Sequence, residues 1–170
     1  MLAEEYKSAV TRLAEALLSE DELGMVVRAH IHLENQLQKF ILAAAKNSDE
    51  VKFSETDYAG TVRLAIVLGL NPKLKPALNA AGRLRNKFSH RLEMKLGEEE
   101  AKCLLATLSP SDTHLMHEIY IQLRTTAQSN GKEKAKKRQQ ASARERVQLF
   151  FISIFARLIS ERHKLKADNR

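Results

Sequence analysis

The segment from Arg83 to His90 contains two arginines, an asparagine and a histidine within about two turns of a helix. Arginine presents a rigid fork of N–H donors that fits a phosphate group. Histidine is the side chain that most readily accepts and donates a proton near neutral pH. The amide of Asn86, directly after Arg85, can hold a phosphate oxygen or the imidazole itself. A phosphodiesterase that works without a metal requires these groups, so the segment is our candidate catalytic site.

Apolar spacing predicts that this segment belongs to a helix that begins near Pro72 and Pro76. Four polar residues share the side of that helix opposite its apolar residues: Asn79, Arg83, Asn86 and His90. Arg85 lies at the edge of the apolar side, about 140° from His90. These two side chains meet only if the helix kinks or ends near Ser89, or if they converge across a dimer interface. A plain hydrated helix face is the alternative interpretation.

A second polar pair interrupts the apolar face of the helix expected over residues 20–46. Five residues define that face: Leu23, Val26, Leu37, Ile41 and Ala44. His30 and Glu34 fall in its middle and are neighbours on the helix. Buried polar groups require partners, so we expect a His30–Glu34 hydrogen bond or an ion pair between Glu34 and Arg85. The functional alternative is that this face borders the active cleft.

The composition is typical of a helical protein of one domain. The 170 residues are 44% hydrophobic, with 6 glycines, 3 prolines and no tryptophan. The single cysteine, Cys103, excludes an internal disulfide and a zinc site built from cysteines. No segment approaches the roughly 20 apolar residues of a membrane span, and the first residues have no signal-peptide pattern. We therefore expect a cytoplasmic protein that has no membrane partner.

Apolar spacing indicates helices along nearly the whole chain and no strand. The first helices are expected at about 4–19 and 20–46, and Ser54 or Thr56 is expected to cap a third that stops at 69–72. The fourth runs through the Arg83–His90 segment, and two more cover about 98–108 and 113–128. The last begins between 132 and 144 and carries core residues from 147 to 159. The fold class is thus all-α, an up-down bundle of about six to seven helices in a single domain, 1–170.

The net charge of +7 is concentrated in a basic arm or linker at about 131–146, which leads into the last helix. Seven basic residues stand there against two glutamates: Lys132, Lys134, Lys136, Lys137, Arg138, Arg144 and Arg146. Basic clusters favour nucleic acids and other polyanions, so these seven are our candidate RNA-binding residues. The alternative is a solvated helix face that carries charge for solubility.

A metal site is a weaker interpretation. His114 and His117 are three residues apart on an expected helix, and His30 and Glu34 are four apart, but neither pair has a third ligand in the sequence. No glycine-rich loop precedes a helix, so a nucleotide-phosphate loop is absent. We expect neither a metal nor another cofactor.

The run Arg85-Asn86-Lys87-Phe88-Ser89-His90 resembles the motif of the HEPN superfamily of helical domains, an Arg followed after four to six residues by His, often with Asn next to the Arg. Arg83 also satisfies the looser spacing. Features over about 23–160 resemble the mannitol-operon-repressor-like branch: Leu-Glu-x-x-Leu at 33–37, Gly-Leu at 69–70, an acidic helix start at 98–100 and Arg-Glu-Arg at 144–146. The chain shows no convincing helix-turn-helix with a basic recognition helix, so direct reading of DNA is not expected.

The resemblance implies an α-helical bundle, commonly a homodimer that brings two such motifs together. Active members are metal-independent endoribonucleases, often toxins or defence effectors, which makes three residues catalytic and three supporting: Arg85, Asn86 and His90, and then Arg83, His30 and Glu34. RNA is the implied substrate, and an antitoxin or operon-encoded protein the implied partner. Other members have lost catalysis and act as regulators through protein–protein contacts, in the repressor-like branch on transcription.

Overall fold

The computed structural model describes residues 2–90, 94–129 and 141–168. In these residues the chain forms seven α-helices and no strand, which confirms the all-α prediction. The helices are α1 (Leu2–Leu18), α2 (Glu22–Ala44), α3 (Tyr58–Val67), α4 (Lys75–Ser89), α5 (Glu98–Leu105), α6 (Pro110–Ser129) and α7 (Ala143–Asp168). Three short 3-10 turns join them: η1 (Ser48–Glu50), η2 (Phe53–Glu55) and η3 (Pro72–Leu74). None of the described helices is long and apolar enough to cross a membrane.

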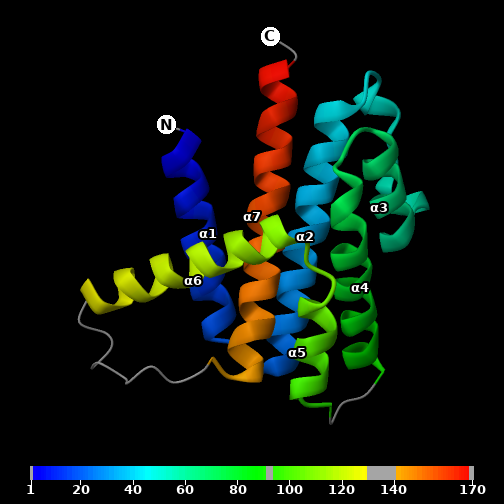
Figure 1. Ribbon diagram of the computed structural model, residues 1–170. Coiled ribbons are helices and arrows are strands. Elements are labelled where there is room, and N and C mark those ends of the chain that lie inside the picture. Colours follow the sequence, from blue (N-terminus) through cyan, green and yellow to red (C-terminus); the bar gives the residue numbers. More distant parts are fainter. Residues whose placement is uncertain (1, 91–93, 130–140, 169–170) are drawn as a thin grey trace.

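Helices α2 and α7 lie side by side at the centre of the bundle (Figure 1). Helix α7 also packs against α1, α5 and α6, and α2 packs against α1, α3 and α4. The middle of α7 is buried on nearly every side, and its large apolar residues are fully buried: Val147, Phe150, Phe151, Ile154 and Leu158. Burying each such side chain contributes about 1.5–3 kcal/mol. The prediction that this helix completes the core is confirmed.

Two aspartates cap the N-termini of α2 and α3, the helices that pack against α4. Asp21 caps α2, where its carboxylate accepts a hydrogen bond from the Gly24 N–H at 2.6 Å. Asp57 caps α3 in the same way, accepting from the Gly60 N–H at 2.7 Å. The prediction that Ser54 or Thr56 caps α3 is wrong, because Asp57 is the cap, while Ser54 lies in the preceding 3-10 turn η2 and Thr56 ends that turn. Their side chains are therefore not placed to bond the first N–H groups of α3.

Helix α4 presents one face to the core and the other outward, as the apolar spacing predicts. Its first turn follows η3, whose Asn71 side chain accepts a hydrogen bond from the Lys73 N–H. The inward face is buried: Ala77, Leu78, Ala81, Leu84 and Phe88. On the outward face Asn79 is partly exposed, and Arg83, Asn86 and His90 are exposed. The predicted polar side of this helix is confirmed.

The first turn of α7 is tied to the ends of three other helices. Ser142 and Glu145 form a reciprocal cap, in which each backbone N–H donates to the other residue's side chain. Arg144 donates to the backbone carbonyl of Glu20, between α1 and α2, at 2.5 Å. Arg146 forms an ion pair with Glu98, the first residue of α5. The start of α7, left open between 132 and 144 by the sequence, is thus fixed at Ala143.

A ring and a glycine set the distance between α3 and α4. The Tyr58 hydroxyl donates to the backbone carbonyl of Leu78 at 3.0 Å, which holds the ring against α4. A Cβ atom added at Gly82 would lie 2.9 Å from the Tyr58 Cδ1 and Cε1 atoms, closer than non-bonded carbons approach. Gly82 is therefore required by packing, although glycine is a poor helix former.

We expect the Gly82→Ala substitution to lower the free energy of unfolding by about 1 kcal/mol. The added methyl group overpacks the Tyr58 contact by roughly 1–3 kcal/mol, which exceeds the helix-propensity gain of about 1 kcal/mol. Urea denaturation measures the change. In a Tyr58→Leu background the same substitution should be neutral or stabilising, and stabilisation of the wild-type chain by Gly82→Ala would contradict the contact.

Candidate functional site

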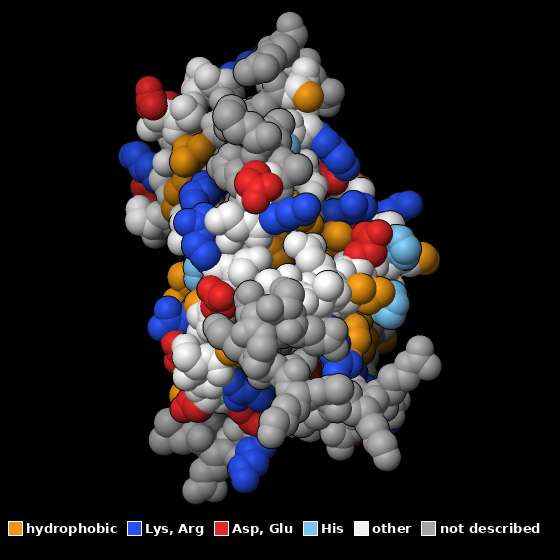
Figure 2. Space-filling model, turned by 90° about the vertical axis from the view of Figure 1, so that its left-hand side faces the viewer, with side chains coloured by type: hydrophobic (Ala, Val, Ile, Leu, Met, Phe, Trp, Pro, Cys, Tyr) orange, Lys and Arg blue, Asp and Glu red, His pale blue; other side chains and the backbone are white. Residues whose placement is uncertain are grey.

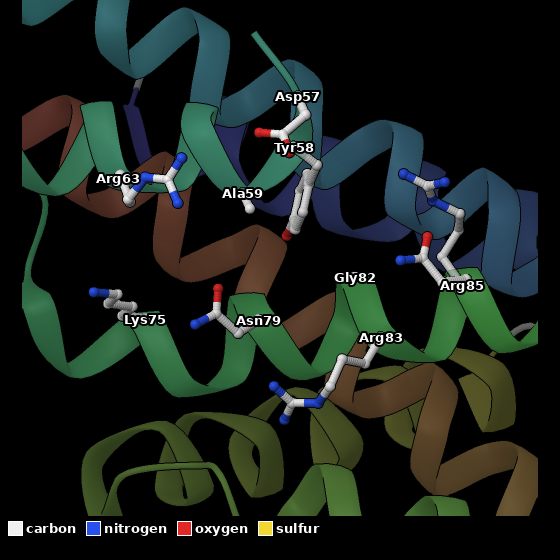
Figure 3. Close-up of a pocket in the computed structure, with 10 residues that line it drawn as sticks. Asp57, Tyr58, Ala59, Arg63, Lys75, Asn79, Gly82, Arg83 and Arg85 are labelled. Atoms are coloured by element: carbon white, nitrogen blue, oxygen red, sulfur yellow. The ribbon is translucent and has the colours of Figure 1, made fainter.

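The outward face of α4 carries two adjoining hollows, which we call together the α4 groove. The larger, of about 490 Å³, lies between α3 and α4 and is lined by Asp57, Tyr58, Ala59, Arg63, Lys75, Asn79, Gly82, Arg83, Arg85 and Asn86 (Figure 3). The smaller, of about 400 Å³, lies at the end of α4 and is lined by Arg83, Asn86, Lys87 and His90. Arg83 and Asn86 line both hollows, so the two hollows adjoin at these residues along α4.

Three of the predicted site residues share the smaller hollow: Arg83, Asn86 and His90. Helix α4 ends at Ser89, and His90 follows as its exposed C-terminal cap. The Ser89 hydroxyl donates to the Arg85 carbonyl at 3.0 Å, which satisfies one of the last carbonyls of the helix. The helix thus ends near Ser89, as one of the alternatives for bringing Arg85 and His90 together requires, but the two residues line different hollows. The last turn also favours positive charge, because the helix carries its partial negative charge there.

The side chain of Arg85 points in a different direction from that of Arg83. Figure 3 shows the two side chains on different sides of α4, with the Arg85 guanidinium directed toward α2. Arg85 is half-buried, and its charge acts on two nearby rings: it adds to the lowering of the pKa of His30 by burial, and it partly opposes the rise that burial causes in the pKa of Tyr58. It lines the larger hollow but not the one that contains His90. Within one chain, Arg83 is thus the arginine that lies with the histidine.

His30 lies in the core beneath this region, with 2% of its surface exposed. Its ring centroid is 4.2 Å from that of Tyr58. Burial, because a buried imidazole resists charging, and to a smaller extent the Arg85 guanidinium together lower the pKa of His30 to about 4. His30 is therefore neutral at pH 7 and lines neither hollow.

The polar partners expected for His30 and Glu34 do not form. Among the described residues, His30 Nε2 has no hydrogen-bond partner, and no ion pair joins Glu34 to His30 or to Arg85. The physical reason is that the His30 ring packs on Tyr58 and not on Glu34. Glu34 acts on the same aromatic residue from a distance, since its negative charge contributes with burial to the raised pKa of Tyr58. The prediction of a His30–Glu34 or Glu34–Arg85 pair is wrong.

The candidate RNA-binding arm falls mostly outside the described residues. Five of its members lie there: Lys132, Lys134, Lys136, Lys137 and Arg138. Arg144 and Arg146 are described, and both guanidiniums contact other helices, through the Glu20 carbonyl and the Glu98 carboxylate. The hydrogen bond from Arg146 lowers the pKa of Glu98. These two arginines join helices in the structure, and their role toward RNA stays a prediction.

The candidate metal ligands do not assemble in the described part of the chain. His114 Nε2 lies 3.4 Å from a carboxylate oxygen of Glu118, one turn along α6. No group of three or more histidine, cysteine, aspartate or glutamate side chains is placed to hold an ion within residues 2–90, 94–129 and 141–168.

The groove also contains cations that sequence analysis did not assign to the site. Lys75 precedes Asn79 by four residues, so the helical period could have found it, and Lys87 lies within the candidate segment itself. Arg63 and Tyr58 come from α3, and no local pattern connects them to α4. Only the packing of α3 on α4 brings them to the groove.

The cations of the groove have no partner of opposite charge among the described residues. Arg63, Lys75, Arg83 and Lys87 form no ion pair with any described residue. Elsewhere many cations are paired: Arg28 with Glu20, Arg146 with Glu98, Arg157 with Asp112 and Lys164 with Glu161. Acidic and basic side chains are also mixed on the face over α1 and α6 (Figure 2). The groove therefore gathers four unpaired cations along one face of the molecule.

No protein-family model matches the chain, and no curated protein or solved structure is detectably similar to it. The fold class is shown by the helices themselves. The resemblance of the Arg85–His90 segment to the HEPN motif stays a prediction. Function is therefore inferred from the groove and the chemistry of the residues that line it.

The buried His30 makes stability depend on pH. The unfolded imidazole has a pKa near 6.5 and the folded one a pKa of about 4, so between these values only the unfolded chain binds the proton. We expect the His30 contribution to the free energy of unfolding to fall by about 2 kcal/mol from pH 7 to pH 5. Urea denaturation at several pH values in this range gives the free energy of unfolding at each pH. This free energy should depend less steeply on pH for His30→Gln than for the wild-type chain. Equal slopes would mean that His30 titrates normally in the folded protein.

Proposed function

We propose that the protein is a metal-independent endoribonuclease whose reaction takes place in the smaller hollow of the α4 groove. The observation that carries the proposal is that Arg83, Asn86 and His90 line this one exposed hollow. It combines a donor fork, an amide and an imidazole at a place that solvent reaches. The unpaired cations of the adjoining hollow add positive potential that attracts a polyanion.

The chemistry follows from the side chains. His90 takes the proton from a ribose 2′-hydroxyl, and the 2′-oxygen then attacks the adjacent phosphorus. The bond from phosphorus to the 5′-oxygen breaks, and this oxygen leaves with a proton supplied by an imidazolium or by water. Arg83 neutralises the charge that grows on the phosphate oxygens, and Asn86 donates its amide N–H to one of them. The products are a 2′,3′-cyclic phosphate and a 5′-hydroxyl, and DNA, which lacks the 2′-hydroxyl, is not cut.

The arginine of the site is assigned differently by the motif and by the fold. The HEPN resemblance gives the charge-stabilising role to Arg85, whereas the geometry of one chain supports Arg83, which lines the same hollow as His90. Arg85 serves instead beside His30 and Tyr58, where its charge acts on both rings. A homodimer that brings in Arg85 from a second copy is the arrangement that the resemblance implies.

We expect His90→Ala to reduce RNA cleavage by about 100-fold to 10,000-fold, because a general acid–base group contributes that much. The assay incubates labelled RNA with the protein in EDTA and identifies the cyclic-phosphate ends. The matched control is His117→Ala, an exposed histidine on α6, far along the chain from the groove. The proposal would fail if the His90→Ala variant cleaved RNA at the wild-type rate, or if EDTA abolished cleavage by the wild-type protein.

Lysine substitutions at Arg83 and Arg85 distinguish the roles of the two arginines. A lysine keeps the charge but loses the fork of donors, so Arg83→Lys should lower the cleavage rate by about 100-fold. Arg85→Lys should leave the rate within a few-fold of wild type, since its side chain is directed toward α2. Single-turnover rates at saturating RNA make the comparison. The reverse result would assign catalysis to Arg85, as the motif does.

The alternative is a non-catalytic regulator that acts through protein–protein contacts. The observation that favours it is the half-buried Arg85, because the arginine of the motif then supports the packing of α4 near α2. Such a protein leaves RNA intact in the EDTA assay. For a toxin, expression arrests growth and His90→Ala relieves the arrest, whereas for a regulator the substitution at His90 does not matter.

A further inference from the structure

We infer that the larger hollow of the α4 groove is a phosphate-binding subsite that seats the nucleotides beside the cleavage position of a single-stranded RNA. Arg63 and Lys75 are its principal cations. The inference rests on the proposed function, because it names the path that the substrate follows to His90. It assigns residues of α3 and of the first turn of α4 to substrate binding, which the Arg83–His90 segment alone does not suggest.

The two hollows form one track. Lys75, Asn79, Arg83, Asn86 and His90 recur on one face of α4 at the helical period. A helix rises about 1.5 Å per residue, so the track from Lys75 to His90 is about 22 Å long. A stacked strand has one phosphate per about 3.4 Å and covers that distance in about six nucleotides. A hexanucleotide therefore reaches both ends of the groove, and a dinucleotide does not.

The charges of the larger hollow favour an anion. Arg63 and Lys75 have no ion-pair partner among the described residues, and Arg83 closes the same hollow. The acidic residue in its lining is Asp57, whose carboxylate already accepts the Gly60 N–H at 2.7 Å as the cap of α3. Positive side chains held together without counter-charges repel one another, and a phosphate chain relieves that repulsion.

The lining also indicates which part of RNA is held. Its aromatic residue, Tyr58, has its hydroxyl bonded to the Leu78 carbonyl and its ring packed on His30 and near Gly82. A base therefore finds no free ring on which to stack. Apart from the Asp57 carboxylate, the remaining polar groups are guanidiniums, an ammonium and the amides of Asn79 and Asn86, all of which donate to phosphate oxygens. Binding here should follow the backbone, with little sequence preference and a strong dependence on salt.

The test measures binding apart from cleavage. In the His90→Ala background, fluorescence anisotropy follows oligouridylates of two, four, six and eight nucleotides. Affinity should rise with length up to about six nucleotides. Adding Arg63→Ala and Lys75→Ala should weaken hexanucleotide binding at least tenfold, leave the dinucleotide unchanged, and reduce the salt slope by about 1.4 for two lost contacts. The charge-matched control is Lys39→Ala with Lys46→Ala, two exposed lysines that line neither hollow.

Three outcomes would overturn the subsite: an equal loss of affinity at every length, an equal loss in the control pair, or tighter binding of a duplex of the same length. Arg63 and Lys75 are exposed and have no described partner, so thermal unfolding should confirm that the variants fold. The two proposals fail separately. If the wild-type chain binds the hexanucleotide through Arg63 and Lys75 without cutting RNA, the nuclease reading fails and the subsite stands. If it cuts RNA but the double variant keeps the same KM on long and short substrates, the subsite fails and the nuclease stands.

Discussion

The middle of helix α7 carries large apolar side chains on nearly every side, so it must be surrounded by other helices for them to be removed from water. This constraint places α2 against one side of it and α1, α5 and α6 around the rest. Helix α4 then lies in the outer layer, packed mainly on α2, α3 and α5. Because only one of its faces is needed for the core, the other face is free to carry charge. The groove exists because α7, and not α4, occupies the centre.

The sequence predicts those features that depend on the helical period alone. The spacing of apolar residues places Arg83, Asn86 and His90 on one exposed face of α4, and these residues line a common hollow. The same reasoning places His30 on the apolar face of α2, where it is buried. It also predicts that Arg85 and His90 do not point together from a straight helix, and they line different hollows. The helical period determines on which side of a helix a side chain lies. Which side of the helix is packed against the core then determines whether that side chain is buried or exposed.

The features that were not predicted depend on contacts between helices. Arg63 reaches the groove because α3 packs on α4, and the closeness of that packing requires a glycine opposite the Tyr58 ring. The expected partnership of His30 with Glu34 fails for the same reason, since an aromatic ring from α3 occupies the neighbouring space. No sequence pattern within α2 or α4 indicates where the Tyr58 ring from α3 lies. Sequence analysis thus finds the residues of the smaller hollow and misses the wall that α3 adds to the larger one.

The clamps at the beginning of α7 have a consequence for how the chain acquires its structure. Arg144 and Arg146 join α7 to the α1–α2 junction and to α5, contacts that close loops of more than 40 residues. During synthesis, α1 to α6 emerge before α7, so the faces of α1, α2, α5 and α6 that pack on α7 lack that partner until it is made. Contacts between residues far apart in the sequence slow folding, because the chain loses conformational entropy when the loops close, before the burial of apolar surface offsets that loss. The nascent chain therefore exposes these faces until α7 docks, and ribosome-bound chaperones are expected to engage it during that interval.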